Sequence, residues 1–179
     1  MNRLISFLFV LISIFLYSCK STSVTVPAQT SSIEETKDVD EEFTRSTQGI
    51  AITKEEFNAD KTEILSIISE MSKIMADYNY NEWLSFIEPA SIKYWSNSAN
   101  LLQASKRLPV RGQRLYNLND YFTYVFVPSR KGRSVEEIRY ISRISVKAVQ
   151  VREDTDIVYY NFVKINGKWM VKIPPLSAN

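Results

Sequence analysis

Histidine is absent from this chain, cysteine occurs once, and there are four glycines among 179 residues. Without histidine, the commonest zinc ligand, the usual general base and every Ser-His-Asp or Cys-His device are missing, which excludes most hydrolase and metalloenzyme classes. A single thiol cannot form a disulfide within the chain, so packing alone has to hold the fold. No glycine-rich phosphate loop and no metal-ligand spacing occurs. We therefore expect no cofactor and no bound metal.

The first residues have the pattern of an export signal. Arg3 precedes an apolar run from Leu4 to Leu16, and two further residues lead to Cys19. A membrane-spanning helix is the alternative, but it needs about 20 apolar residues and this run is shorter. An ordinary secretory signal followed by a buried free cysteine is a second alternative, although polar residues follow Cys19. The pattern favours a signal peptide over residues 1–18, cleaved before Cys19.

The residues Leu16-Tyr17-Ser18-Cys19 resemble the bacterial lipobox. The bulky Tyr17, where the common pattern has a small residue, is similar to the relaxed lipobox of spirochaetes. The resemblance implies a diacylglyceryl thioether on Cys19 and an acyl chain, such as palmitate, on its amino group. Each buried methylene contributes about 0.8 kcal/mol, and two or three chains anchor stably. It thus implies a spirochaete-type lipoprotein in the cell envelope, with its domain periplasmic or surface-exposed.

The segment 19–52 is rich in Ser and Thr and carries an acidic block. The block consists of Glu34, Glu35, Asp38, Asp40, Glu41 and Glu42. Such a composition is typical of a disordered tether, and we predict one here, followed by a single globular domain over 53–179. A specific partner for the acidic block is the alternative.

Helices are predicted at the start of the domain. Thr53 and Glu56 form a capping box, and apolar residues then recur every three or four positions up to a helix end near Asn79. The apolar positions of this first helix are Ile64, Ile67, Ile68, Met71, Ile74, Met75 and Tyr78. A second short helix is predicted from Tyr80 to Ile87, and a third from Ile92 to Leu102, all packing on the same core.

The segment 121–127 fits either a strand or a helix capped by Asn119, and we favour a helix. Pro128 should end it, because proline cannot donate a backbone hydrogen bond.

The last third predicts strands. Alternating apolar residues indicate one long strand from Ile138 to Ala148, followed by a turn at Glu153-Asp154. Asn166-Gly167 is a strong hairpin signal, because both central residues of a type I′ turn need positive φ. The resulting register places Tyr160 opposite Ile173, Phe162 opposite Val171 and Lys164 opposite Trp169. We therefore predict an α+β fold, with N-terminal helices packed on a curved antiparallel sheet that ends in a three-stranded meander.

Trp83 in a short helix, and a hairpin running from Phe162 through Asn166-Gly167 to Val171, resemble the nuclear-transport-factor-two-like and ketosteroid-isomerase-like superfamily. The segment Tyr121 to Arg130 looks more like spirochaetal lipoproteins of unassigned function. The superfamily resemblance implies a cone-shaped fold over about residues 53–174, with a pocket lined by Trp83, Tyr160 and Phe162.

Enzymes of that superfamily use a pocket carboxylate as base and a tyrosine or histidine as oxyanion donor. The candidates here are Asp120, Asp156, Tyr159 and Tyr160. Their positions are equally typical of a solvated turn aspartate and of ordinary strand aromatics. We therefore expect no enzyme and no catalytic residue.

Positive charge gathers between Lys106 and Arg152, where eleven Lys and Arg face three acidic residues. Arg139, Arg143 and Lys147 share the polar face of the predicted long strand. Such a face attracts anionic partners, although a solvated face without a partner has the same pattern. We expect no nucleic acid partner in the envelope.

The sequence thus predicts a lipid-anchored envelope lipoprotein whose domain is a non-catalytic binding module. An anionic ligand or an envelope protein would bind through Arg139, Arg143 and Lys147. The alternative is a small-ligand carrier or enzyme that uses the apolar pocket at Trp83, Tyr160 and Phe162. The sequence does not determine the oligomeric state.

Overall fold

A computed structural model describes residues 40–110, 112–153 and 155–177. A helical part comes first and a sheet second, which confirms the α+β class. The helical elements are α2 (Lys54–Ala76), α3 (Tyr80–Phe86), α4 (Pro89–Trp95), α5 (Ser98–Ser105), α6 (Leu118–Tyr121), the π-helical turn η1 (Phe122–Phe126) and α7 (Val127–Arg130). The strands are β1 (Glu137–Ser142), β2 (Ser145–Gln150), β3 (Ile157–Ile165) and β4 (Lys168–Lys172).

The long helix α2 begins at the predicted capping box. Thr53 Oγ1 accepts the Glu56 N–H at 3.1 Å, and Glu56 Oε2 accepts the Thr53 N–H at 3.0 Å. These two bonds satisfy amides that a helix start leaves free. Asn79 then caps α3, accepting the Glu82 N–H at 3.3 Å.

The predicted third helix is two helices, α4 and α5. Asn97 lies between them with an extended backbone, and its side chain accepts the Ala99 N–H at 2.9 Å. The apolar spacing continues through the break, so periodicity could not reveal it. An Asn side chain that bonds to the backbone competes with a continuous helix here.

The helix favoured for residues 121–127 is present, but its limits differ from the prediction. It is capped by Asn117 rather than Asn119, and Pro128 lies inside it, in the first turn of α7. Because proline has no N–H, the helical hydrogen-bond ladder lacks one bond at Pro128. Before it, the Val127 N–H donates to the carbonyl of Phe122, five residues back, which makes the π turn.

The single long strand predicted from Ile138 to Ala148 is wrong, because β1 and β2 form a hairpin. Arg143 and Ile144 make its two-residue turn, and Ile144 is 57% exposed. A loop with an even number of residues preserves the alternation, so the buried positions on either side stay in phase. The sheet is therefore a four-stranded antiparallel meander in the order β1-β2-β3-β4, and its last three strands form the predicted meander at the end of the sheet.

The second hairpin has the predicted turn and register. Asn166 and Gly167 have φ of 49° and 82°, and Phe162 lies opposite Val171, as Lys164 does opposite Trp169. The third predicted pair, Tyr160 with Ile173, falls beyond the end of β4.

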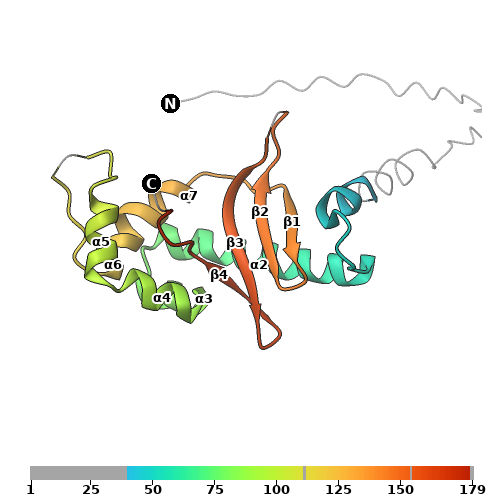
Figure 1. Ribbon diagram of the computed structural model, residues 1–179, viewed down its shortest axis with the longest axis horizontal. Helices are drawn as coiled ribbons and strands as arrows, with labels where there is room; N and C mark the ends of the chain where they lie inside the picture. The colour runs from blue at the N-terminus through green and yellow to red at the C-terminus, as the bar shows by residue number, and fades with distance from the viewer. Residues whose placement is uncertain (1–39, 111, 154, 178–179) are drawn as a thin grey trace, which may run out of the picture.

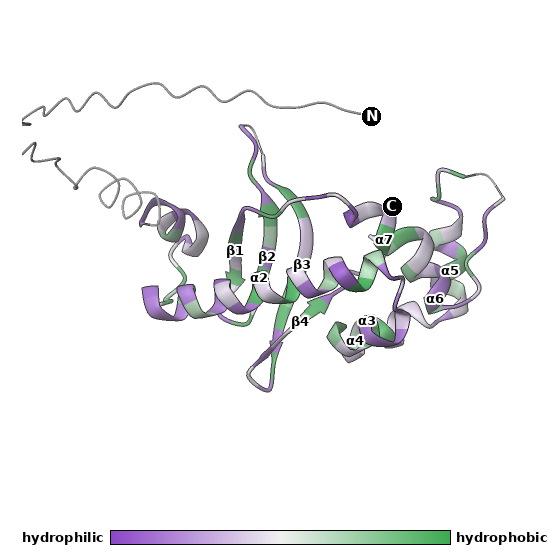
Figure 2. Ribbon diagram, turned by 180° about the vertical axis from the view of Figure 1, so that it is seen from behind, coloured by the Kyte–Doolittle hydropathy of each residue, from purple (hydrophilic) through white to green (hydrophobic). Residues whose placement is uncertain are grey.

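One face of the sheet packs on α2 and forms the core. Figures 1 and 2 show α2 running across the sheet on that side, while the helices from α3 to α7 gather beyond β4. Cross-strand rows of buried residues, such as Tyr140, Val146, Phe162 and Val171, point to α2. In Figure 1 the opposite face is turned to the viewer, and no described helix crosses it. We call it the open face.

Order begins before Thr53, where the sequence placed the start of the domain. Residues 40–47 are helical, and Phe43 packs edge-on against Phe57, with ring centroids 5.5 Å apart. Asp40 pairs with Lys54 at 2.6 Å. Part of the acidic block is thus neutralised by α2, which the composition of the segment alone does not show. The predicted signal at 1–18, Cys19 and residues 20–39 lie outside the described residues.

Candidate functional site

The three predicted anion-binding residues lie on one hairpin but in two different settings. Arg139 on β1 lies directly opposite Lys147 on β2, and both are on the open face. Arg143 belongs to the turn between the strands. The predicted common face is therefore formed across two strands, not along one.

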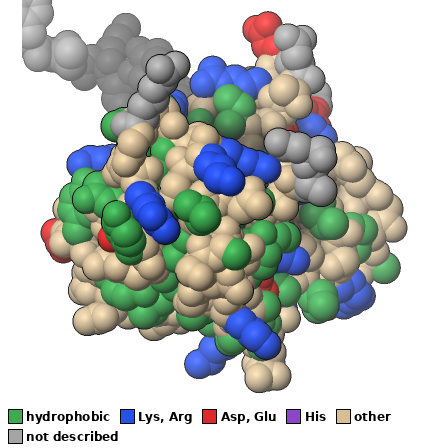
Figure 3. All heavy atoms as spheres, turned by 60° about the vertical axis from the view of Figure 1, so that its left-hand side comes forward, with side chains coloured by type: hydrophobic (Ala, Val, Ile, Leu, Met, Phe, Trp, Pro, Cys, Tyr) green, Lys and Arg blue, Asp and Glu red, His purple; other side chains and the backbone are tan. Residues whose placement is uncertain are grey.

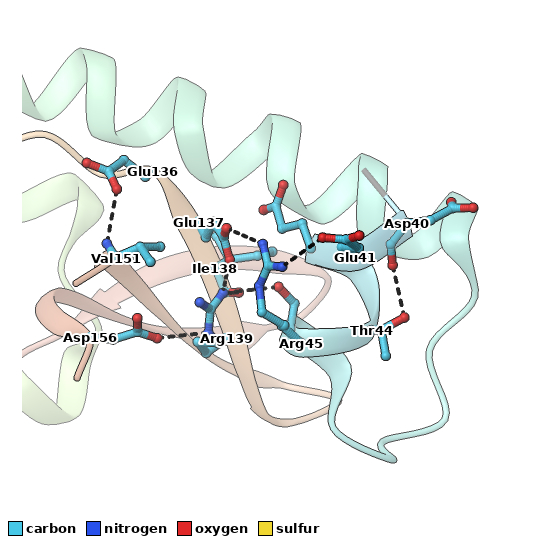
Figure 4. A network of polar contacts seen from close by, with 12 residues as sticks. Asp40, Glu41, Thr44, Arg45, Glu136, Glu137, Ile138, Arg139, Val151 and Asp156 are labelled. Atoms are coloured by element: carbon cyan, nitrogen blue, oxygen red, sulfur yellow. Dashed lines mark hydrogen bonds and ion pairs between the residues drawn. The ribbon is translucent and has the colours of Figure 1, made fainter. Parts of the chain in front are cut away.

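Arg139 is held by acidic neighbours. Its Nη1 contacts Glu137, its Nε lies 2.9 Å from Asp156 Oδ2, and Nη1 also donates to Ser46 Oγ at 3.3 Å. Figure 4 shows the Arg139 guanidinium between Glu137 and Asp156, with Arg45 on the other side of Glu137. The pKa of Glu137 is lowered, because hydrogen bonds from Arg45 and Arg139 outweigh its burial. Arg139 is thus a structural cation that joins β1, the start of β3 and the helix at 40–47.

Arg143 is also paired. Its guanidinium lies 2.8 Å from Glu56 and donates to the carbonyl of Ala51 at 2.6 Å. Both sides of the Arg143–Glu56 pair are exposed, so the pair contributes little to stability. The turn is nevertheless tied to the start of α2.

Lys147 has no ion pair among the described residues, and it belongs to a row that crosses the whole sheet. Pairing runs from Arg139 to Lys147, from Lys147 to Asn161, and from Asn161 to Lys172. We call these four residues the open-face row. Lys172 also lacks an ion pair in the described part of the chain. Sequence reasoning missed Lys172, although the hairpin register already placed its side chain on the face of the sheet opposite to that of Val171.

Apolar side chains flank the row. Val163 on β3 and Met170 on β4 lie opposite one another, and both are half-buried although no described helix covers them. They therefore place apolar surface beside the cations of the open-face row. Figure 3 brings the left, helical side of Figure 1 forward and shows Lys and Arg scattered among apolar groups there, with few acidic side chains.

The rings predicted to line a pocket lie in the core. Trp83, Tyr160 and Phe162 are at most 3% exposed. The rings of Trp83 and Phe126 are 5.1 Å apart between centroids, those of Phe126 and Tyr160 are 6.3 Å apart, and those of Tyr160 and Phe162 are 6.0 Å apart. The side chain of Phe126, from η1, thus stands between the residues that were expected to face a ligand.

A buried carboxylate that the sequence analysis did not select lies on the sheet side of α2. Asp60 is 7% exposed. Asp60 Oδ1 accepts from Lys164 Nζ at 2.6 Å and from Trp169 Nε1 at 2.9 Å, and Oδ2 accepts from the Tyr140 hydroxyl at 2.7 Å. We call Asp60 and its three donors, Tyr140, Lys164 and Trp169, the Asp60 cluster. The position of Asp60 between Phe57 and Ile64 on the apolar face of the helix was the signal that could have revealed it.

Asp60 and Lys164 border a hollow of about 340 Å³, which Glu56 and Arg143 also line. Burial raises the pKa of Asp60. The hydrogen bonds from Lys164, Trp169 and Tyr140 together lower it by more than burial raises it, so the pKa lies below its ordinary value. Burial and the bond to Asp60 raise the pKa of Tyr140. A carboxylate with three donors and a lowered pKa is a weak general base.

Stability should therefore depend on pH through Asp60. The folded-state pKa lies below that of the unfolded chain, about 3.9, so the carboxylate stabilises the fold at neutral pH and the effect is lost as pH falls. We expect the free energy of unfolding to decrease below about pH 5. Urea unfolding measured across this range should show a shallower decrease in Asp60→Asn. An equal decrease in both proteins would contradict this role of Asp60.

The remaining catalytic candidates have local bonding roles. Asp120 Oδ2 accepts the Tyr116 N–H at 2.7 Å, at the turn into α6. Asp156 pairs with Arg139, and the Tyr159 hydroxyl donates to Gln150 at 3.3 Å. Among the described residues, no group of three or more Cys, Asp or Glu side chains is arranged to hold a metal ion. In the same part of the chain, no helix is long and apolar enough to cross a membrane.

Comparison with known proteins gives one informative similarity. An uncharacterized lipoprotein of Treponema pallidum (strain Nichols) is 31% identical over 120 residues, which cover 67% of this chain and 64% of that protein. The matched part thus spans just under two thirds of the relative. The similarity confirms the resemblance to spirochaetal lipoproteins of unassigned function and supports membrane attachment through a lipid.

No protein-family model matches the chain, and no solved structure matches it. The resemblance to the nuclear-transport-factor-two-like superfamily therefore stays a prediction.

Proposed function

We propose that this protein is an envelope lipoprotein, anchored by lipid on Cys19, whose domain is a non-catalytic module that docks an acidic protein on the open face of its sheet. The observation that carries the proposal is the open-face row, in which Lys147 and Lys172 lack ion pairs among the described residues. Two cations without counter-ions on a sheet face attract an anionic surface.

Apolar groups next to the row favour a protein partner. Val163 and Met170 offer surface that a partner can remove from water, while Lys147 and Lys172 supply complementary charge in the neighbouring cross-strand row. Stable protein interfaces combine an apolar centre with a polar rim, and complementary charge gives the docking its specificity and rate.

Two observations support a module without chemistry of its own. Asp60 is engaged by three donors, and Phe126 fills the space between Trp83 and Tyr160. The first arrangement makes Asp60 a weak general base for the enzyme alternative. The second fills the apolar pocket that either a carrier or an enzyme would need.

The anchor limits where the partner can lie. Residues 20–39 join Cys19 to the first described residue, and a chain of that length cannot span more than about 70 Å even when fully extended. The first described residue therefore lies within that distance of the membrane that holds the acyl chains, and the proposed partner is an envelope protein that the tethered domain can reach.

Charge reversal on the open face tests the proposal. In cells that make the lipidated protein, Lys147→Glu with Lys172→Glu should abolish crosslinking to an acidic partner. Lys93→Glu with Lys106→Glu changes the net charge equally on α4 and at the end of α5, and should leave the crosslink intact. Recovery of the complex should also fall as salt is raised, because exposed charges are screened.

Two outcomes would overturn the proposed docking. Crosslinks that survive the Lys147 and Lys172 reversals would exclude the open-face row. Binding to protein-free anionic vesicles that the same reversals abolish would make the membrane surface the occupant, in place of an acidic protein.

A further inference from the structure

Three basic side chains within four residues border a hollow that no carboxylate lines. Arg130 ends α7, and Lys131 and Arg133 follow it in the turn around Gly132. The other wall comes from the end of α2. The hollow has a volume of about 260 Å³, and its lining residues on α2 are Ser72, Met75 and Ala76. We call it the α7 hollow.

Arg130 is the most informative of the three. Its Nε is buried without a hydrogen-bond partner, and Nη1 donates to the Phe126 carbonyl at 3.3 Å and to Ser129 Oγ at 2.9 Å. The guanidinium carbon lies 3.8 Å from the centroid of the Phe126 ring and 5.2 Å from that of Tyr160. Burial lowers its pKa, yet arginine keeps its proton in proteins. All these partners are neutral, so a largely buried positive charge has no counter-ion among the described residues.

The surroundings do not supply the missing negative charge. Glu70, on the same part of α2, pairs with Lys73 at 2.9 Å. Glu136, which follows the turn, accepts the Val151 N–H at 3.1 Å. The end of α2 carries a partial negative charge of about half a unit, which is small against three cations. Because an uncompensated buried charge is costly, an anion bound from outside would stabilise the site.

We propose that the α7 hollow binds the phosphate group of a small phosphate monoester. A monoester is close to a dianion at neutral pH, so it matches several cations better than a carboxylate does. Guanidinium groups recognise phosphate oxygens through paired hydrogen bonds. The volume exceeds that of a phosphate group, and Met75 and Ala76 offer an apolar wall to a short carbon chain. The site is separate from the open-face row, so either can exist without the other.

Calorimetric titration of the lipidated full chain in neutral detergent tests this proposal, with inorganic phosphate and glycerol 3-phosphate as probes. Both should bind, and Lys131→Ser with Arg133→Ser should weaken binding about tenfold or more. These two side chains are exposed, so the variant should fold. Lys93→Ser with Lys106→Ser removes the same charge elsewhere and should leave the affinity unchanged. Arg130→Lys keeps the charge but loses the planar fork, and should also weaken binding.

The source of the phosphate is distinguished by a vesicle arm. Binding to vesicles containing phosphatidic acid, without binding to the soluble esters, would assign the same phosphate chemistry to a lipid headgroup, provided that Lys131→Ser with Arg133→Ser abolishes it. Absence of binding to all probes, or an equal loss of affinity in the Lys93 and Lys106 variant, would overturn the proposal.

Discussion

Phe126→Ala is expected to lower the free energy of unfolding by about 4 kcal/mol, the middle of the range for truncating a buried phenylalanine to alanine in a packed core. Phe126 is 0% exposed. Its ring lies between those of Trp83 and Tyr160 and supports the Arg130 guanidinium. The substitution would leave a cavity where α3, η1 and β3 meet, because three separate elements cannot all move in to fill it.

Urea unfolding of the full chain carrying Cys19→Ser, which removes the proposed lipid acceptor, would measure this loss of stability. Tyr124→Ala is the matched control, because Tyr124 belongs to the same π-helical turn but is 50% exposed. This control should lower the free energy of unfolding by no more than about 0.5 kcal/mol, as other surface substitutions do. Similar losses in the two variants would show that the π turn itself, and not the aromatic packing, holds this region.

Asp60→Asn should lower the free energy of unfolding by about 3 kcal/mol at neutral pH, the lower end for breaking a buried ion pair. The amide keeps the shape of the carboxylate but leaves the Lys164 ammonium without a counter-ion and offers one acceptor oxygen to three donors. The lower end applies because the Lys164 side chain is 28% exposed and keeps part of its hydration.

The exposed pair Lys73–Glu70 on the same helix gives the control. Glu70→Gln should change the free energy of unfolding by no more than about 0.5 kcal/mol. A double-mutant cycle of Asp60→Asn with Lys164→Met should show strong coupling, since the two residues share one interaction. Additive losses would mean that Tyr140 and Trp169, not Lys164, account for the effect of Asp60.

Local signals predicted the elements whose cause is local. The capping box at Thr53 and Glu56 determined where α2 begins, and Asn166-Gly167 determined the register of β3 and β4. The breaks at Asn97 and at Arg143-Ile144 were missed, because both leave the apolar periodicity in phase. Asp60 was missed because a polar residue within an apolar stripe looks like an exception until its partners are known.

The candidate sites depend on partners far apart in the chain. Arg139, Arg143 and Lys147 are alike in sequence, yet Asp156 and Glu56 pair with the first two. Lys147 remains without an ion pair among the described residues. In the sequence, Arg130 looks like an ordinary basic residue at a helix end. In the structure, η1 and β3 surround it with neutral groups. Charge composition therefore indicated a basic region without showing which cations lack counter-ions.

By itself, the sequence determined the class of fold, the second hairpin with its register, and the resemblance of Leu16-Tyr17-Ser18-Cys19 to a lipobox. Periodicity, capping and turn chemistry act over a few residues, so a sequence is enough to reveal them. Only the tertiary structure decided which carboxylates meet which cations, and that Trp83 and Tyr160, two of the rings expected to line a pocket, pack against Phe126. Burial and ion pairing depend on where distant segments cross, and no local pattern encodes that.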